Sequence, residues 1–250
     1  MRYLGGKSRI AKELARIIVP HIQDTYAEPF IGGLAIAKEI ALQVDHPITM
    51  YLSDIHPDLI LLYQAMQNEW IPPEFVSEEM YKEYRHKEPS ALRGFIGFGC
   101  SFGGKWYGGY ARYQNRNFAS ESIRNLISCF ELFKQHTIIF THQSYADVQE
   151  SSVTYCDPPY RNTTEYSMQF NYNIYNSWLL QRKGIVFCSE YTQPYGTIVY
   201  EKEKRTEVNK DNRAVFNTER LYKLDNRDPL EEYQRLSQEI QPYESENVLP

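Results

Sequence analysis

Asp157, Pro158, Pro159 and Tyr160 are consecutive and combine groups that could support chemistry on an amine. They follow an apolar run at 152–156, which predicts a buried strand ending in a rigid turn. The prolines lack N–H donors, so the turn presents carbonyl oxygens, one carboxylate and an aromatic ring. Asp157 and the Pro158 carbonyl could accept the hydrogens of an adenine N6 amino group whose ring stacks on Tyr160, leaving the nitrogen lone pair facing a methyl donor. The alternative is that the prolines merely end a strand at a sheet edge.

A second pattern, at residues 27–54, predicts a nucleoside site. Residues 27–35 read as a strand, a tight turn at Gly32-Gly33 and a helix, an arrangement that brings a backbone close to a nucleoside. Another apolar strand, at 48–53, ends at Asp54, about twenty residues beyond the glycines, the spacing at which an acid meets ribose hydroxyls. We predict that Asp54 binds a nucleoside; the alternative is that it caps a helix opened by Pro57.

The N-terminal residues Gly5, Gly6 and Lys7 could bind an anionic group, a carboxylate or a phosphate, through backbone donors and a positive charge. They precede apolar residues at helical spacing that stops at Pro20, and we expect Ser8 to cap this helix. The glycine spacing is not that of a P-loop. The alternative is a solvated lysine at an ordinary helix start.

Taken in order, these patterns resemble the Dam-type (D12 class) DNA adenine-N6 methyltransferases. The motifs that carry the resemblance are 4–7 (LGGK), 28–33 (EPFIGG), 52–60 (LSDIHPDLI), 144–147 (SYAD) and 157–160 (DPPY). The similarity extends through about residue 224. Here, as in that family, the cofactor loop comes first, the target-recognition segment next and the catalytic tetrapeptide last, which disfavours the circularly reordered methylase classes.

The resemblance implies an α/β fold: a seven-stranded, Rossmann-like S-adenosylmethionine-dependent methyltransferase core with a mainly helical, loop-rich target-recognition insertion. We place the catalytic core at 1–68 and 136–224, the insertion at 69–135 and an acidic C-terminal tail at 225–250. Residues 185–191 resemble the strand and loop beside the target-base pocket. The cofactor S-adenosylmethionine is expected to be bound by Tyr3, Gly5, Gly6, Lys7, Glu28, Phe30, Gly32, Gly33, Asp54 and Asp157. The catalytic residues are expected to be Asp157, Pro158, Pro159 and Tyr160, with no metal.

Two positions depart from the family pattern. Gly32-Gly33-Leu34 replaces the commoner alternation of glycine with another residue, and His56-Pro57 replaces an asparagine-containing sequence. Neither change removes a group on which the expected chemistry depends.

The expected partner, double-stranded DNA, is consistent with the distribution of charge. The chain has a net charge of −5, but much of the acidity lies in the tail. Between Lys82 and Arg124 there are eight basic residues against three acids, and seven of the thirteen glycines lie there among aromatic residues. We predict DNA contacts from Lys105, Trp106, Tyr107, Arg112 and Arg116. The alternative is a surface loop with its aromatic side chains in the core. Ser120 is expected to cap the following helix.

The remaining composition suits a cytoplasmic enzyme of a bacterial or phage-infected cell. The chain has 250 residues and no apolar run near the roughly 18 needed to span a membrane. The four cysteines form no metal-binding spacing and are read as reduced. We expect a monomer. A basic hairpin near 202–213 could touch phosphates, although a solvated surface fits those residues equally well.

The predicted reaction is direct methyl transfer to N6 of an adenine flipped out of the duplex. Three alternatives stay open: an RNA or protein-glutamine N-methyltransferase, a non-enzymatic DNA-binding decoy and, with least support, a nicotinamide-dependent oxidoreductase. The sequence does not fix the recognition site, for which GATC is the leading candidate. It also does not separate a solitary methylase from one with a cognate restriction endonuclease.

Overall fold

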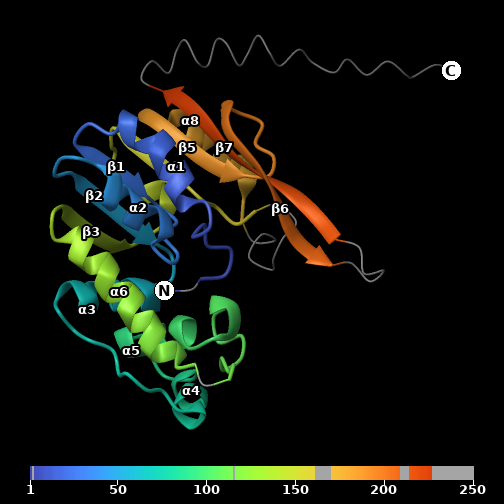
Figure 1. Cartoon of the computed structure of the whole chain (residues 1–250). Helices are drawn as coiled ribbons and strands as arrows, with labels where there is room; N and C mark the ends of the chain where they lie inside the picture. Colours follow the sequence, from blue (N-terminus) through green and yellow to red (C-terminus); the bar gives the residue numbers. More distant parts are fainter. Residues whose placement is uncertain (2, 115, 161–169, 209–213, 227–250) are drawn as a thin grey trace. The chain divides into compact units, whose positions relative to one another are not determined.

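The computed structural model describes residues 1, 3–114, 116–160, 170–208 and 214–226. The chain divides into two compact units, Met1–Pro158 and Pro159–Pro250 (Figure 1). Nearly all of the acidic tail expected at 225–250, and the tip of the basic hairpin at 209–213, lie outside the described residues.

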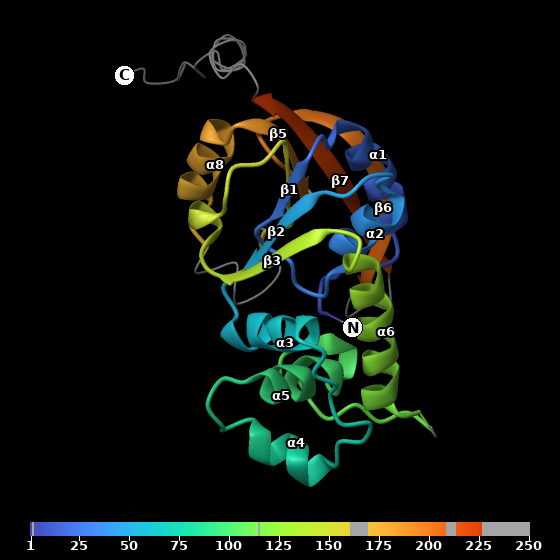
Figure 2. The ribbon, with the colours of Figure 1, turned by 90° about the vertical axis from the view of Figure 1, so that its left-hand side faces the viewer.

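The first unit contains a parallel sheet of four strands in the order β3-β2-β1-β4. Its strands are β1 (Thr25–Glu28), β2 (Thr49–Asp54), β3 (Thr137–His142) and β4 (Val153–Cys156). The strands predicted at 48–53 and 152–156 are thereby confirmed. All four residues of β4 are buried, because a central parallel strand is covered on both faces. Figure 2 shows β1, β2 and β3 side by side.

Three helices follow the N-terminal segment and the first two strands: α1 (Ala11–Ile18), α2 (Ala35–Gln43) and α3 (Pro57–Gln67). In α1 the buried residues Ala11, Leu14, Ala15 and Ile18 recur at helical spacing, and a 3-10 turn at Val19–His21 holds Pro20. The cap expected from Ser8 is wrong, since the residue before α1 is Ile10 and no side chain caps it.

The insertion is mainly helical, as predicted. It comprises α4 (Glu78–Tyr84), α5 (Ala91–Gly94), a π-helical turn at Phe95–Gly99, a 3-10 turn at Phe102–Gly104 and α6 (Phe118–Phe133). The cap of α6 is Asn117, whose side chain accepts from the backbone N–H of Ser120, so the cap expected from Ser120 is wrong. Because α6 packs against α2 and α3, the insertion is anchored on core helices.

The second unit contains α8 (Tyr172–Gln181), β5 (Gly184–Glu190), β6 (Thr197–Val208) and β7 (Ala214–Asn226). β7 pairs antiparallel with both β5 and β6. The hairpin near 202–213 is thus formed by β6 and β7, and the strand predicted at 185–191 is β5. Asn226 fastens α8 to this sheet by donating to the carbonyls of Leu179 and Arg182, each at 2.9 Å.

The described residues therefore contain seven strands in a mixed α/β arrangement, and the predicted Rossmann-like α/β class is confirmed. None of the described helices combines the length and the apolar character that a membrane crossing requires. The boundaries predicted for the insertion stay a prediction. What matters for function is that four parallel strands place their carboxyl ends at one edge, where α/β proteins bind ligands.

Candidate active site

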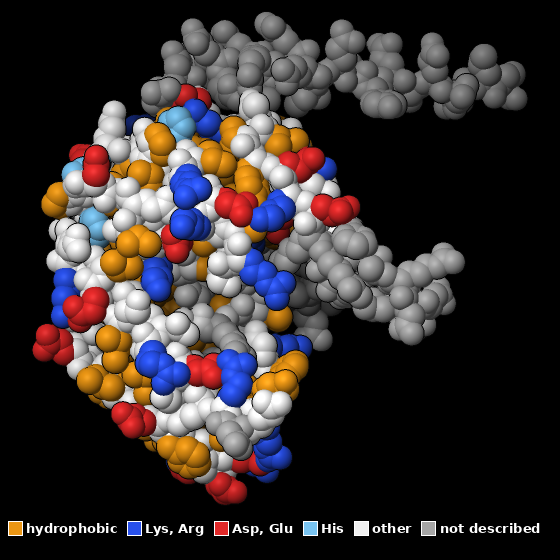
Figure 3. Space-filling model, viewed as in Figure 1, with side chains coloured by type: hydrophobic (Ala, Val, Ile, Leu, Met, Phe, Trp, Pro, Cys, Tyr) orange, Lys and Arg blue, Asp and Glu red, His pale blue; other side chains and the backbone are white. Residues whose placement is uncertain are grey.

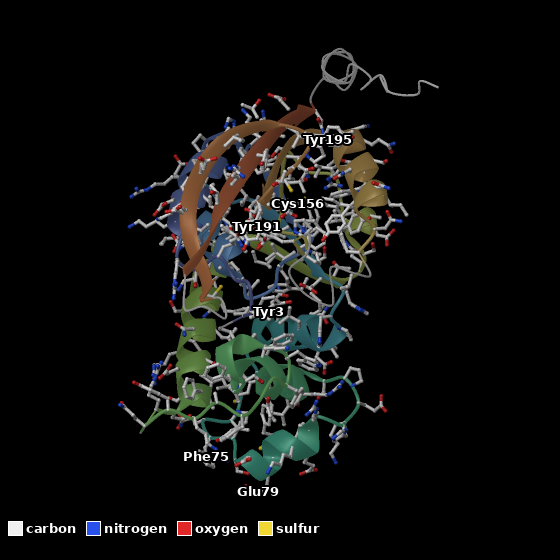
Figure 4. All side chains as sticks on the ribbon, turned by 90° about the vertical axis from the view of Figure 1, so that its right-hand side faces the viewer. Tyr3, Phe75, Glu79, Cys156, Tyr191 and Tyr195 are labelled. Carbon is white, nitrogen blue, oxygen red and sulfur yellow. The ribbon has the colours of Figure 1, made fainter. Side chains whose placement is uncertain are left out.

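The carboxyl edge of the four-stranded sheet brings three acids of the sequence motifs together. Glu28 ends β1, Asp54 ends β2 and Asp157 directly follows β4, whose last residue, Cys156, is labelled in Figure 4. Glu28 is 2% exposed and Asp54 is 8% exposed, whereas the side chain of Asp157 is 19% exposed. Asp157 lies more than a hundred positions beyond Glu28 and Asp54 in the sequence, and the parallel pairing of β1 with β2 and β4 gathers the three acids.

Asp54 holds the glycine turn that follows β1. Its Oδ2 accepts from the Gly32 N–H (3.1 Å) and its Oδ1 from the His56 N–H (3.0 Å). Burial raises the pKa of Asp54 to about 6, against the opposing effect of these two hydrogen bonds. Helix α3 begins after His56 without a side-chain cap, so the alternative reading of Asp54 as its cap is wrong. The structure instead places this acid against the turn.

Tyr3 explains why both positions of that turn are glycine. A Cβ on Gly32 would lie 2.9 Å from the Tyr3 ring, and a Cβ on Gly33 would lie 2.8 Å from the Tyr3 Cβ. Gly32 also has a φ of +42°, which side chains rarely adopt. The Tyr63 hydroxyl donates to the Gly32 carbonyl at 2.6 Å and thereby holds the turn in place. The N-terminal segment and the glycine turn therefore form one surface.

Lys7 forms an ion pair with Asp157 inside the first unit. Its Nζ lies 2.6 Å from Oδ1 and 2.8 Å from Oδ2, and the Lys7 side chain is only 5% exposed. The same Nζ lies 3.4 Å from the carbonyl oxygen of Gly5. The sequence predicted that Lys7 helps to bind an anionic group of a ligand, which stays a prediction; the contact that the structure shows is with Asp157, 150 positions away. A lysine that contacts both carboxylate oxygens fixes the direction in which Asp157 points.

Glu28 and Phe30 flank the turn on its strand side. Glu28 accepts a hydrogen bond from the Tyr26 hydroxyl at 2.9 Å, and burial raises its pKa well above the usual range. The Phe30 ring stacks on Tyr145 with 5.6 Å between centroids. Sequence reasoning quoted Tyr145 within a motif but gave it no role, because nothing local indicates which ring it will face.

The second unit fixes the ring of Tyr160. Its hydroxyl donates to Glu219, a buried residue of β7, and its ring meets Tyr191 edge-on at 4.7 Å. The Pro159 carbonyl accepts from the Tyr172 hydroxyl at 2.8 Å. Glu219 lies 59 positions from Tyr160, and no sequence signal identified it. Figure 4 labels Tyr191 at the end of β5.

Comparison with known proteins agrees with this geometry. Residues 3–94 match the family model of the D12 class N6 adenine-specific DNA methyltransferases. A DNA adenine methylase of Vibrio cholerae is 24% identical over 89% of this chain and 84% of its own length. These matches confirm the resemblance to the D12 class. A DNA adenine methylase of Escherichia coli is 25% identical over 74% of this chain and 72% of its own length. A type II methyltransferase of Paramecium bursaria Chlorella virus is 26% identical over 66% and 70%.

The model of the D12 class covers the cofactor motifs and the first part of the insertion but stops before Lys105. The DNA contacts predicted beyond that point rest on this chain alone. Lys105 is exposed. Arg112 forms an ion pair with Glu78, and Arg116 with Glu121. These three cations lie at the surface, as a role in DNA binding requires.

Trp106 and Tyr107 differ from those cations because they belong to an aromatic cluster. Trp106 packs edge-on against His56 at 4.3 Å, and the Arg93 guanidinium lies 5.3 Å from its ring centroid. Tyr107 is 5% exposed. Because Tyr107 is this buried, its side chain packs inside the loop, and the predicted base contacts of this segment would have to come from its exposed residues.

Proposed function

We propose that this chain is a site-specific DNA methyltransferase that transfers the methyl group of S-adenosylmethionine to N6 of an adenine in duplex DNA. The observation that carries the proposal is the carboxylate of Asp157, which follows β4 directly and is held by Lys7 at the edge where Glu28 and Asp54 also end. The D12 relationship supplies the reaction class. The relatives are named for DNA adenine methylation, and we carry that substrate over to this chain.

The residues at this edge suit S-adenosylmethionine. Gly32 and Gly33 carry no side chains, so the backbone of this turn can approach a nucleoside closely. Asp54 is an acceptor for ribose hydroxyls. Lys7, also expected to bind the cofactor, would share its ammonium between Asp157 and the carboxylate of the amino-acid end. The rings of Phe30 and Tyr145 offer apolar surface for a purine. When bound, this cofactor supplies an electrophilic methyl group on a positively charged sulfur.

In the proposed mechanism, Asp157 and the Pro158 carbonyl accept the two hydrogens of the adenine amino group. This contact turns the N6 lone pair out of conjugation with the ring and toward the methyl carbon. A carbon–nitrogen bond forms as the carbon–sulfur bond breaks, and the electron pair of the broken bond stays on sulfur. N6 then gives one proton to Asp157, which passes it to water. Tyr160, whose ring is fixed through Glu219 and Tyr191, would stack on the flipped base.

The test is transfer of labelled methyl to unmethylated duplex DNA, followed by nucleoside analysis and mapping of the modified positions. For the wild type we expect N6-methyladenine within a short motif. For Asp157→Ala we expect the rate of methyl transfer to fall at least about 1000-fold, the order of magnitude for the loss of an electrostatic and proton-accepting group. The affinity of this variant for the duplex should stay within a factor of about three of the wild type. The matched control is Asp45→Ala, which removes a 95% exposed carboxylate. Substantial methylation by Asp157→Ala would refute the mechanism, and cofactor binding without DNA methylation would redirect the search to RNA or protein substrates.

The recognition sequence, a restriction partner, the oligomeric state and the location of the protein each need a measurement of their own. Mapping tests GATC as the recognition sequence, and cleavage of unmethylated DNA by proteins encoded nearby tests for a restriction partner. We also propose that the chain acts as a monomer in the cytoplasm, which light scattering and cell fractionation would check.

A further inference from the structure

A groove with a volume of about 560 Å³ runs between α4 and the loop Lys105–Tyr110 of the insertion. Helix α4 carries the label Glu79 in Figure 4. Its polar and aromatic lining includes Glu78, Lys82, Arg85, Lys105, Trp106 and Tyr107. Lys105, Trp106 and Tyr107 were predicted to contact DNA, whereas the wall that α4 contributes had no assigned role.

The groove is basic because three cations line it against one acid. Two of these cations and the acid lie on one side of α4 and its C-cap. Glu78, Lys82 and Arg85 follow one another at intervals of four and three, which places them on the same face. The side chain of Lys82 is 72% exposed, and Arg85 and Lys105 are exposed too. Figure 3 shows Lys and Arg side chains on the part of the surface that the insertion forms, at the bottom of the view.

Glu78 is the acid of this groove, and it is shared between two cations. It lies 3.0 Å from the Lys82 Nζ and also forms an ion pair with Arg112, while its own side chain is 29% exposed. Exposed ion pairs of this kind contribute little stability, so an anion of higher charge density can replace the carboxylate. Three lining cations against one acid leave a surplus of positive charge for such an anion.

The walls of the groove are fixed to each other by buried contacts. Tyr81 of α4 is 5% exposed, and its hydroxyl accepts from the Gly109 N–H at 3.2 Å and lies 2.6 Å from the Ser101 Oγ. Its ring packs against Tyr107 at 5.0 Å. The Tyr110 hydroxyl donates to the Val76 carbonyl at 2.6 Å. The two walls are therefore held together before binding, and the ordering cost is confined to the exposed side chains of the cations.

We propose that this groove binds the sugar–phosphate backbone of the duplex outside the target site, with Lys82 of α4 and Arg85 at its C-cap as phosphate contacts and Glu78 as the carboxylate that the phosphate displaces. The inference rests on the proposed function for the identity of the partner. The proposed DNA-binding surface of the protein would then extend from the glycine-rich loop to α4, a helix that contacts phosphates and no bases. Backbone contacts of this kind set register and salt dependence, and they carry no sequence information.

The test measures binding of a fluorescent duplex without the recognition motif, at salt concentrations from 50 to 200 mM, by the full-length protein. For Lys82→Ala/Arg85→Ala the slope of log affinity against log salt should fall by about 1.8, since each lost phosphate contact removes roughly 0.9. The advantage of the wild type over this variant should therefore shrink by about 12-fold across that range. The matched control is Lys87→Ala, a cation paired with Glu83 at 2.9 Å that does not line the groove, and its slope should stay that of the wild type.

A second variant keeps the proposal falsifiable if the double variant folds poorly. Glu78→Gln should bind the same duplex more tightly, because it removes the competing carboxylate, whereas damage to the fold could only weaken binding. An unchanged salt slope in the double variant, or weaker binding by a folded Glu78→Gln, overturns the proposal. Failure of the proposed function would look different. If the wild type methylates no DNA but shows the expected salt slopes, the proposed reaction is refuted and the proposal for the groove stands.

Discussion

The buried carboxyl group of Asp54 should make cofactor binding depend on pH in a window set by its pKa of about 6. Burial holds this pKa above the ordinary value of 3.8, so the folded protein keeps a proton on Asp54 at acidities where an exposed aspartate would be ionised. Ribose hydroxyls donate best to the ionised form. Cofactor affinity should therefore be fully present above pH 6 and be lost as the pH falls through 6.

The magnitude follows from the fraction of Asp54 that is ionised. With a pKa of about 6, roughly nine-tenths of the carboxyl groups are ionised at pH 7 and one-tenth at pH 5, so affinity should fall about tenfold between the two. Calorimetric titration with S-adenosylhomocysteine measures this, and below pH 6 it should also register release of a proton from Asp54 on binding, because the ligand selects the ionised form. Asp54→Asn should bind weakly at both values with no trend.

His142 is the neighbour whose charge lowers the pKa of Asp54, so it needs its own control. His142→Gln removes that charge and should move the fall in affinity toward higher pH without abolishing it. Equal affinities of the wild type at pH 5 and pH 7 would refute the assignment of Asp54 as an ionised ribose ligand. A pH trend that persisted in Asp54→Asn would assign the titration to another group.

Two substitutions test the packing that supports the site. Gly32→Ala should lower the free energy of unfolding, measured in urea, by more than the roughly 1–2 kcal/mol that a left-handed φ costs a residue with a side chain. The loss should be larger because the new Cβ also meets the Tyr3 ring. The control is Gly103→Ala, where φ is positive but the space is open, and it should show the backbone cost alone. Asp58→Asn should cost about 3 kcal/mol in the same measurement, since the 1% exposed carboxylate accepts from the Ser90 N–H at 2.9 Å and pairs with Arg93 at 3.2 Å. A loss below about 1 kcal/mol for Asp58→Asn would show that this pair does not hold α5.

The strands and turns of the site could be predicted from sequence because their signals are local. A parallel strand covered on both faces reads as an apolar run, and the acid or glycine that follows it marks the carboxyl edge. Asp54 at the end of β2 and Asp157 directly after β4 were found in this way, whereas Glu28 came from the family resemblance. Helix caps were less accessible: Asn117 and Ser120 are both good capping residues three positions apart, and only the geometry selects Asn117.

Partners at long range could not be predicted, since propensity and periodicity say nothing about them. The ion pair of Lys7 with Asp157 and the bond from Tyr160 to Glu219 each join residues more than fifty positions apart. Composition also fails to separate a stacking surface from a packed one. Trp106 and Tyr107 stand in a glycine-rich, basic segment that suggests base contact, but their rings pack against other aromatic side chains, a fact visible only in the folded chain.

Three alternate residues, beginning with Asp54 at the end of β2, connect the glycine turn to the insertion. Asp54 accepts from the glycine turn, the His56 ring packs edge-on against Trp106, and Asp58 accepts from Ser90 at the start of α5. Burial lowers the pKa of His56 to about 4, so its imidazole is neutral at physiological pH and suits an aromatic cluster. This packing gives a physical reason for histidine where the family has an asparagine-containing sequence. The segment proposed to bind the nucleoside thus also supports the loop that carries Lys105, and a substitution at His56 should act on both.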